Sequence, residues 1–228
     1  MQTLMIKLSG EALKNGSEDI FDYALIRSLA TKIQSLVTKW YRIAMVLGAW
    51  NIYRGARQED IDRVQWDYVG ILATVINAVV FSQILEQSGQ KTKIFSSLSV
   101  PTMADDFNTK AAQQALQDGY VVICAGGTGH PFFTTDTATV QKALELRCDI
   151  VVKATKVDGV YDKDPIKFSD VKKFDTISLQ EVYDKGLEVL DRTAFALALE
   201  NKMPMIVCKI EDIDKIGSIW FISTQITI

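Results

Sequence analysis

Apolar and polar positions alternate along the chain in two patterns, short apolar runs and longer amphipathic segments. The short runs are typical of buried strands and occupy Thr3–Leu8, Tyr41–Leu47, Lys93–Ser96, Tyr120–Ala125, Ile150–Ala154 and Met205–Cys208. The longer segments predict helices at Tyr23–Lys39, Trp66–Gln87, Thr109–Gln117, Ala138–Leu146 and Asp191–Glu200. This alternation predicts an α/β fold, a three-layer sandwich with a mostly parallel central sheet.

Local signals mark the ends of some elements. Asp22 is a plausible N-cap, and Ser178-Leu-Gln-Glu181 is a capping box that opens another helix. We expect Ser218–Ile228 to form an edge hairpin. No linker or internal repeat occurs, so we expect a single domain over residues 1–228, with unequal lobes that divide near residue 150.

The helix at Trp66–Gln87 differs from the others because apolar residues surround it almost completely. Such a helix lies either at the centre of a core or in an interface with another subunit. The pattern alone leaves both interpretations open.

Composition excludes several classes of function. Hydrophobic residues make up 48% of the 228, enough for one substantial core, and the net charge of -3 argues against a nucleic-acid partner. The three widely spaced cysteines and one histidine do not form a zinc motif, and buried reduced thiols are the expected state. The amino terminus lacks the features of a signal peptide, and we find no apolar run long enough to span a bilayer. These features predict a cytoplasmic protein.

A Gly-rich segment, Gly127–Asp136, follows one predicted strand and leads into a helix. Backbone N–H groups at such a bend bind phosphate and other anions. Thr128, Thr134 and Thr135 add hydroxyl groups, and Pro131 stiffens the loop. The segment is therefore a candidate anion or nucleotide site.

Other polar segments follow the ends of strands: Lys7–Gly10, Gly48–Gly55 and Lys153–Pro165. Taken singly, each has an ordinary interpretation as a strand-edge turn or a solvated hairpin. Asp67 and Asp191 are likewise typical of helix starts. Together, however, the strand-end segments predict a ligand site at the carboxyl edge of the sheet. No Walker A motif occurs.

Six motifs then appear in a specific order, KLSGEAL (7–13), NIYRG (51–55), WDYVGILATVIN (66–77), GTGHPFFTTD (127–136), KATKVDGVYDKDP (153–165) and LDRTAF (190–195). This set resembles the bacterial uridylate kinases of the amino-acid-kinase superfamily and covers nearly the whole chain. The resemblance implies a nucleoside monophosphate kinase that transfers the γ-phosphoryl group of Mg·ATP to UMP in pyrimidine nucleotide biosynthesis. It also implies an acceptor lobe over residues 1–150 and an ATP-binding lobe over residues 151–228.

The resemblance also implies the roles of individual residues. The catalytic residues would be Lys7, Arg54, Asp136 and Asp191. ATP would contact Lys7, Leu8, Ser9, Gly10, Trp50, Arg54, Thr155, Tyr161 and Asp164. UMP would contact Ala49, Asp67, Thr128, Gly129, His130, Pro131, Phe132, Phe133, Thr134 and Thr135.

The expected cofactor and partners follow from the same resemblance. Mg²⁺ would be carried by ATP, with no metal site of the protein's own. Related enzymes are typically homohexamers built from dimers, which favours the interface interpretation of the long helix. UTP is an expected inhibitor, whereas the short Lys14–Ile20 segment argues against activation by GTP.

Three positions depart from the family pattern. Ala49 and Trp50 stand where two of three consecutive glycines are usual, and His130 stands where Asn is common. The indole of Trp50 would occupy space where the phosphates of the two substrates meet. If the turn also needs a positive φ, it would store roughly 1–3 kcal/mol of strain. Three explanations compete: the turn swings outward in an active enzyme, the protein is a nucleotide-binding regulatory protein with an impaired active site, or Trp50 is not the natural residue. We favour the active enzyme over these alternatives and over a kinase for carboxylate or carbamate substrates.

Overall fold

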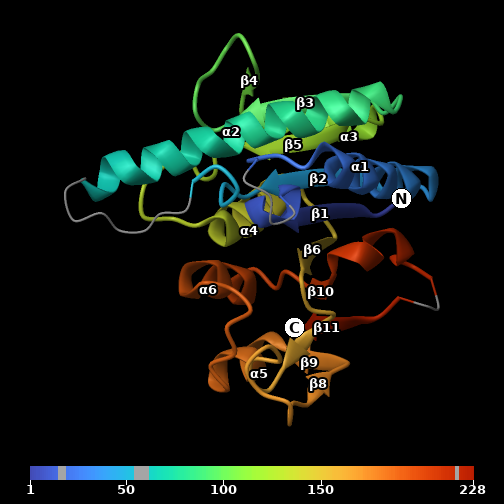
Figure 1. The fold of residues 1–228 in the computed structure, drawn as a ribbon, viewed down its shortest axis with the longest axis vertical. Coiled ribbons are helices and arrows are strands. Elements are labelled where there is room, and N and C mark those ends of the chain that lie inside the picture. The colour runs from blue at the N-terminus through green and yellow to red at the C-terminus, as the bar shows by residue number, and fades with distance from the viewer. Residues whose placement is uncertain (15–18, 54–61, 219–220) are drawn as a thin grey trace.

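The computed structural model describes residues 1–14, 19–53, 62–218 and 221–228, and its centre is a nine-stranded sheet (Figure 1). The strand order is β4-β3-β5-β2-β1-β6-β10-β11-β9. The strands are β1 (Thr3–Leu8), β2 (Arg42–Leu47), β3 (Thr92–Ser96), β4 (Asp105–Asp106), β5 (Val121–Ala125), β6 (Ile150–Thr155), β9 (Thr176–Ser178), β10 (Met205–Lys209) and β11 (Ser223–Thr227). All neighbouring strands are parallel except β10 and β11.

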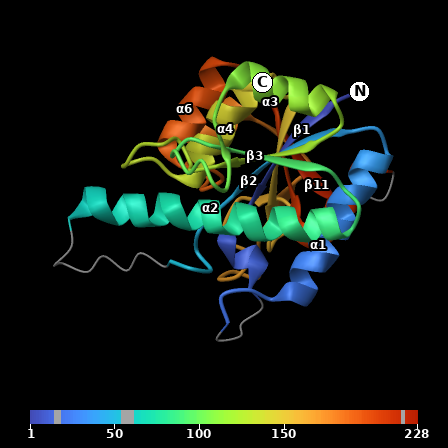
Figure 2. The same ribbon diagram turned by 90° about the horizontal axis from the view of Figure 1, so that it is seen from above.

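Helices cover both faces of this sheet, which confirms the predicted three-layer sandwich (Figure 2). One face carries α1 (Tyr23–Thr38) and α2 (Arg63–Gln87), with the short 3-10 helices η1 (Gly10–Leu13) and η2 (Ile210–Lys215). The other carries α3 (Thr109–Gln117), α4 (Thr135–Glu145), α5 (Leu179–Asp184) and α6 (Arg192–Glu200). A separate antiparallel ribbon pairs β7 (Val160–Tyr161) with β8 (Lys173–Phe174).

Side-chain alternation along β1 decides which residues reach the site. Leu4, Ile6 and Leu8 pack in the core beneath α1 and α2, whereas Met5 packs in the core beneath α3 and α4. Because side chains alternate between the faces of a strand, Lys7 lies on the same side as Met5. The lysine therefore faces the layer that contains α4 and α6.

Capping side chains set where the helices begin. Asp22 accepts from the backbone N–H groups of Ala24 and Leu25, and the Ser178–Glu181 capping box is present, as predicted. The long helix begins at Arg63 rather than Trp66 because Asp62 caps it. The helix predicted from residue 138 begins at Thr135 because Thr134 caps it.

The expectation of an edge hairpin at Ser218–Ile228 is wrong. The segment contributes a single strand, β11, which pairs antiparallel with β10 and parallel with β9. Strand β9, which the apolar pattern did not predict, lies at this end of the sheet. Two residues of the segment, 219 and 220, lie outside the described part of the chain.

Helix α2 is long and apolar enough to cross a membrane by length and composition alone. The expectation that no apolar run has this length is therefore wrong. Within the molecule, more than half of its apolar stretch is buried, and Phe81 and Leu85 pack in the core. Val69, Leu72 and Ile76 remain 48%, 46% and 43% exposed. The core interpretation thus holds for one side of α2, and its other side is apolar surface.

The three cysteines are free and buried. Burial raises the pKa of Cys124 and Cys208 to about 12 and also raises that of Cys148. The predicted structural thiols are confirmed.

Candidate active site

A cavity of about 680 Å³ lies at the carboxyl edge of the sheet. The turns after β1 and β2, the loop after β5, the first turns of α2 and the starts of α4 and α6 form its wall. A second hollow of about 530 Å³, between α2 and residues 101–105, has no lysine or arginine among its described lining residues. Among the described lining residues, the lysines and arginines that could bind an anionic ligand therefore belong to the larger cavity.

Two lysines and one aspartate form the charged centre of this cavity. Lys7 on β1 and Lys153 on β6 are register partners on neighbouring parallel strands. Asp136, in the first turn of α4, lies 3.2 Å from the Lys7 ammonium group and 2.8 Å from that of Lys153. The side chains are largely buried: Lys7 is 13% exposed, Asp136 is 17% exposed and Lys153 is 16% exposed. Lys153 also donates to the backbone carbonyl of Val189.

Burial and charge act in opposite directions on these groups. Burial raises the pKa of Asp136, but the Lys7 and Lys153 ammonium groups outweigh it and hold that pKa below its usual value. Burial lowers the pKa of Lys153, and Asp136 offsets this only in part. The carboxylate thus allows two cations to lie side by side in a largely dry site.

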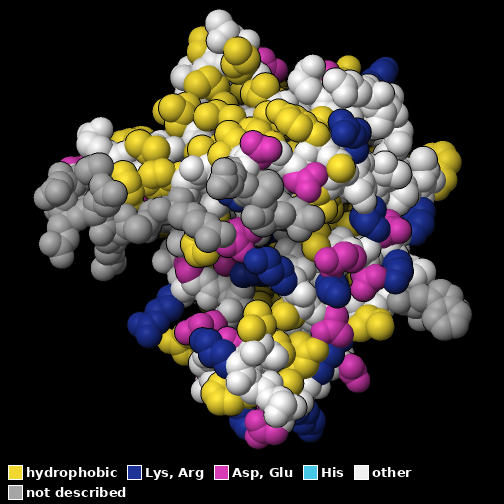
Figure 3. Space-filling model, viewed as in Figure 1, with side chains coloured by type: hydrophobic (Ala, Val, Ile, Leu, Met, Phe, Trp, Pro, Cys, Tyr) yellow, Lys and Arg dark blue, Asp and Glu magenta, His cyan; other side chains and the backbone are white. Residues whose placement is uncertain are grey.

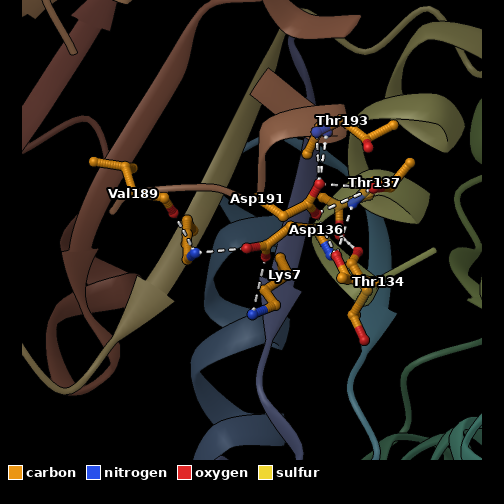
Figure 4. A network of polar contacts seen from close by, with 11 residues as sticks. Lys7, Thr134, Asp136, Thr137, Val189, Asp191 and Thr193 are labelled. Atoms are coloured by element: carbon orange, nitrogen blue, oxygen red, sulfur yellow. Dashed lines mark hydrogen bonds and ion pairs between the residues drawn. The ribbon is translucent and has the colours of Figure 1, made fainter. Parts of the chain in front are cut away.

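Asp191 links the starts of helices α4 and α6 beside the lysine cluster (Figure 4). One of its oxygens accepts from the backbone N–H groups of Thr193 and Ala194 at the start of α6. The carboxylate also accepts from the hydroxyls of Thr134 and Thr137 at the start of α4. Two helix N-termini therefore meet beside the lysines, and their partial positive charges favour an anion there.

The loop after β5 has the conformation that its glycines allow. Gly126, Gly127 and Gly129 have φ values of 74°, 55° and 82°. A Cβ at Gly126 would lie 2.8 Å from the backbone nitrogen of Leu98, so the close approach also requires glycine. The loop residues that line the cavity are Gly127, Thr128, His130, Phe133, Thr134 and Thr135. Gly129, Pro131 and Phe132 are not among its described lining residues, and Phe132 is 64% exposed.

The unusual turn at Ala49 and Trp50 is accommodated without left-handed backbone. Neither residue has a positive φ, so the strain that such a conformation would impose is not present. Ala49 is buried, whereas Trp50 is 64% exposed and lies in the cavity wall. A Cβ at Gly10 would lie 2.3 Å from the Trp50 nitrogen, so the turn packs directly against the backbone of Gly10.

The predicted ATP-binding residues fall into two groups. Lys7, Ser9 and Gly10 line the cavity, while Leu8 is not among its described lining residues and packs in the core. Thr155 ends β6, and Tyr161 and Asp164 lie further along the chain; none of the three is among the described lining residues of the cavity. Their side chains form hydrogen bonds with Val157, Asp158 and Ile166 respectively. Arg54 lies outside the described residues.

Sequence reasoning missed Lys153 and Arg63. Lys153 lies near the carboxyl end of β6 as Lys7 lies near that of β1, and this similarity was the available signal. Arg63 precedes Asp67 by four residues, the spacing of a helical ion pair, and its Nε lies 2.9 Å from that carboxylate. Both line the cavity.

Comparisons with known proteins agree in fold and family. Residues 2–209 match the model of the amino acid kinase family. A uridylate kinase from Wolinella succinogenes is 43% identical over 208 residues, which cover 90% of this chain and 86% of the relative. The crystal structure of UMP kinase from Ureaplasma parvum matches with a TM-score of 0.94 and 30% identity, over 100% of this chain and 99% of that one. The crystal structure of UMP kinase from Bacillus anthracis matches with a TM-score of 0.95 and 30% identity, over 99% of this chain and 96% of that one.

Proposed function

Because this chain belongs to the amino acid kinase family, we propose that it is a uridylate kinase, which transfers the γ-phosphoryl group of ATP to UMP and forms ADP and UDP. The observation that carries this proposal is the cluster of Lys7, Asp136 and Lys153 beside two helix N-termini. That cluster faces the same cavity as the loop after β5.

The chemistry of phosphoryl transfer suits this arrangement. Its transition state spreads negative charge over the transferred group and mainly needs alignment and charge stabilisation. Lys7 and Lys153 supply two positive charges, and Asp136 fixes both ammonium groups before the substrates bind. Asp191 orients the starts of α4 and α6 toward the same point.

We assign the two halves of the chain to the two substrates. ATP phosphates lie against Lys7, Ser9 and Gly10, and its base and ribose lie toward Thr155, Tyr161 and Asp164 in the 151–228 lobe. UMP lies in the 1–150 lobe, with its ribose hydroxyls at Asp67 and its base along residues 128–135. In this assignment Arg54 binds the UMP phosphate.

We propose that Mg²⁺ enters this site bound to the phosphates of ATP. Among the described residues no group of three His, Cys, Asp or Glu side chains is arranged to hold a metal. The oxygens of Asp136 and Asp191 already contact ammonium, hydroxyl and backbone N–H groups. Mg²⁺ commonly binds through substrate phosphates with few protein ligands, and it would supply further charge neutralisation there.

The alternative, a regulatory protein with an impaired active site, rested on Trp50. The ordinary backbone of Trp50 removes the strain argument, whereas its 64% exposed side chain still lies in the cavity wall, so crowding by the indole is left to the activity assay. The assembled lysine pair also favours an enzyme.

The assembly and cellular context complete the proposal. The exposed apolar stripe of α2, formed by Val69, Leu72 and Ile76, supports pairing of two subunits and a hexamer built from such dimers. Figure 3 shows hydrophobic side chains gathered over the upper part of the molecule, where α2 lies. We assign the enzyme to cytoplasmic pyrimidine nucleotide biosynthesis, with UTP as an inhibitor.

A coupled assay of ADP formation tests the activity. With ATP and Mg²⁺ present, UMP should be a far better acceptor than CMP, dCMP or AMP. If UMP were no better than the other three, the assignment would be wrong. Nucleotide binding without turnover, with turnover restored in Trp50→Gly, would support the regulatory alternative instead.

A further inference from the structure

Asp67 connects helix α2 to the loop after β5. Its Oδ2 accepts a hydrogen bond of 2.7 Å from the backbone N–H of Phe132, which lies 65 residues further along the chain. Both carboxylate oxygens also lie 2.9 Å from Nε of Arg63, one helical turn earlier. A carboxylate has about four acceptor positions, so these three contacts leave room for a ligand hydroxyl.

Phe132 adopts a backbone conformation that is unfavourable for its residue type. Its φ is 72°, in the left-handed region where residues other than glycine are uncommon. Its side chain is 64% exposed, so burial of the ring does not explain the conformation. What the conformation does provide is the N–H that reaches Asp67.

Arg63 contacts both sides of this connection. Its Nε donates to Asp67, and its guanidinium carbon lies 5.7 Å from the centroid of the Phe132 ring, within cation–π range. Arg63, Asp67 and the neighbouring Phe133 all line the cavity. The arginine therefore fixes the carboxylate and covers the aromatic ring of the residue that the carboxylate holds.

We propose that Arg63 and Phe132 are positioning residues that act through Asp67 and clamp the loop after β5 onto the first turns of α2. The clamp holds the loop threonines toward the cavity before UMP arrives, so less loop ordering is needed on binding. This inference rests on the proposed function in naming UMP as the ligand. The contacts that form the clamp do not depend on that name.

The first test measures UMP and ATP binding by calorimetry, together with both KM values, in Arg63→Ala and Arg63→Lys. Arg63→Ala should weaken UMP binding about tenfold, in line with the loss of one charged hydrogen bond, and leave ATP binding within twofold. Arg63→Lys should recover part of this loss. Equal weakening of both nucleotides, or no change for UMP, would overturn the proposal.

The second test uses the left-handed conformation. Phe132→Ala and Phe132→Gly both remove the ring and keep the N–H, but glycine adopts positive φ at little cost. Phe132→Gly should therefore bind UMP more tightly than Phe132→Ala. Trp40 is a matched control: it is aromatic, 75% exposed and has a φ of 68°, at the end of α1. Trp40→Ala and Trp40→Gly should leave UMP binding unchanged, and a similar effect at both positions would contradict the clamp.

Hydrogen exchange separates this proposal from the assignment of substrate. The Phe132 amide should exchange slowly in the nucleotide-free protein and at least tenfold faster in Arg63→Ala. If UMP proves not to be a substrate, this result still supports the clamp while the proposed function fails. Unchanged exchange in Arg63→Ala would refute the clamp even in an active uridylate kinase.

Discussion

Lys153→Met tests whether the second lysine of the charged cluster is catalytic. Methionine keeps most of the unbranched side chain and removes the ammonium group. In the protein, that group lies 2.8 Å from Asp136 and also donates to the Val189 carbonyl. The substitution leaves Lys7 as the remaining cation on Asp136.

The expected loss follows from the charge that the cluster presents. Lys7 and Lys153 balance Asp136 and Asp191, and the starts of α4 and α6 each add about half a positive charge. Removing one cation cancels this net positive charge at the place where negative charge accumulates during transfer. A single preorganised donor of this kind contributes about 2.7–4 kcal/mol to transition-state stabilisation. We therefore expect kcat to fall about 10²–10³-fold.

The assay must separate catalysis from folding. Breaking a buried ion pair costs about 3–5 kcal/mol of stability, so thermal unfolding of the variant should be measured first and kcat determined at 25 °C. The KM for UMP should stay within about threefold, because the residues proposed to bind UMP do not include Lys153. Lys163→Met is the control: Lys163 is 44% exposed and pairs with Asp170, so its loss should change neither kcat nor stability appreciably. A folded Lys153→Met protein with kcat within threefold of the parent would refute the catalytic role.

Three further predictions follow from the same structure. Gly10→Ala places a Cβ 2.3 Å from the Trp50 backbone nitrogen and should cost about 1–3 kcal/mol of stability through overpacking. Thermal unfolding measures this loss of stability, and an unchanged melting temperature would contradict the close contact between Gly10 and the Trp50 backbone. The pKa of Asp136 is lowered in the folded protein, so its contribution to stability is fully present above its unfolded pKa of about 3.9 and is lost as pH falls through the folded value. Urea unfolding of the parent and Asp136→Asn between about pH 2 and 7 should therefore give a difference that shrinks only in acid, and a pH-independent difference would count against this. Leu72→Glu changes a side chain that is 46% exposed on α2. If the proposed oligomer forms through this stripe, the substitution should lower the mass measured by sedimentation without unfolding the subunit, and an unchanged oligomer mass would exclude the stripe from the interface.

The sequence determined most of the elements and the edge of the sheet where the candidate site lies. Apolar periodicity predicted the main strands and helices because burial on one face depends on residues only two to four positions apart. Capping by Asp22 and Ser178 was readable for the same reason, since a cap bonds to N–H groups two or three residues away. The motifs around Lys7, Asp136 and Asp191 identified residues that do meet at one edge of the sheet.

Tertiary structure decided which distant residues become partners. Lys153 joins Lys7 because β1 and β6 pair in one particular register, and Phe132 reaches Asp67 because the loop after β5 packs against α2. The position of β11 between β10 and β9 was also settled by packing. Local patterns do not contain this information, because strand register and loop contacts depend on the burial of segments that lie far apart in the sequence.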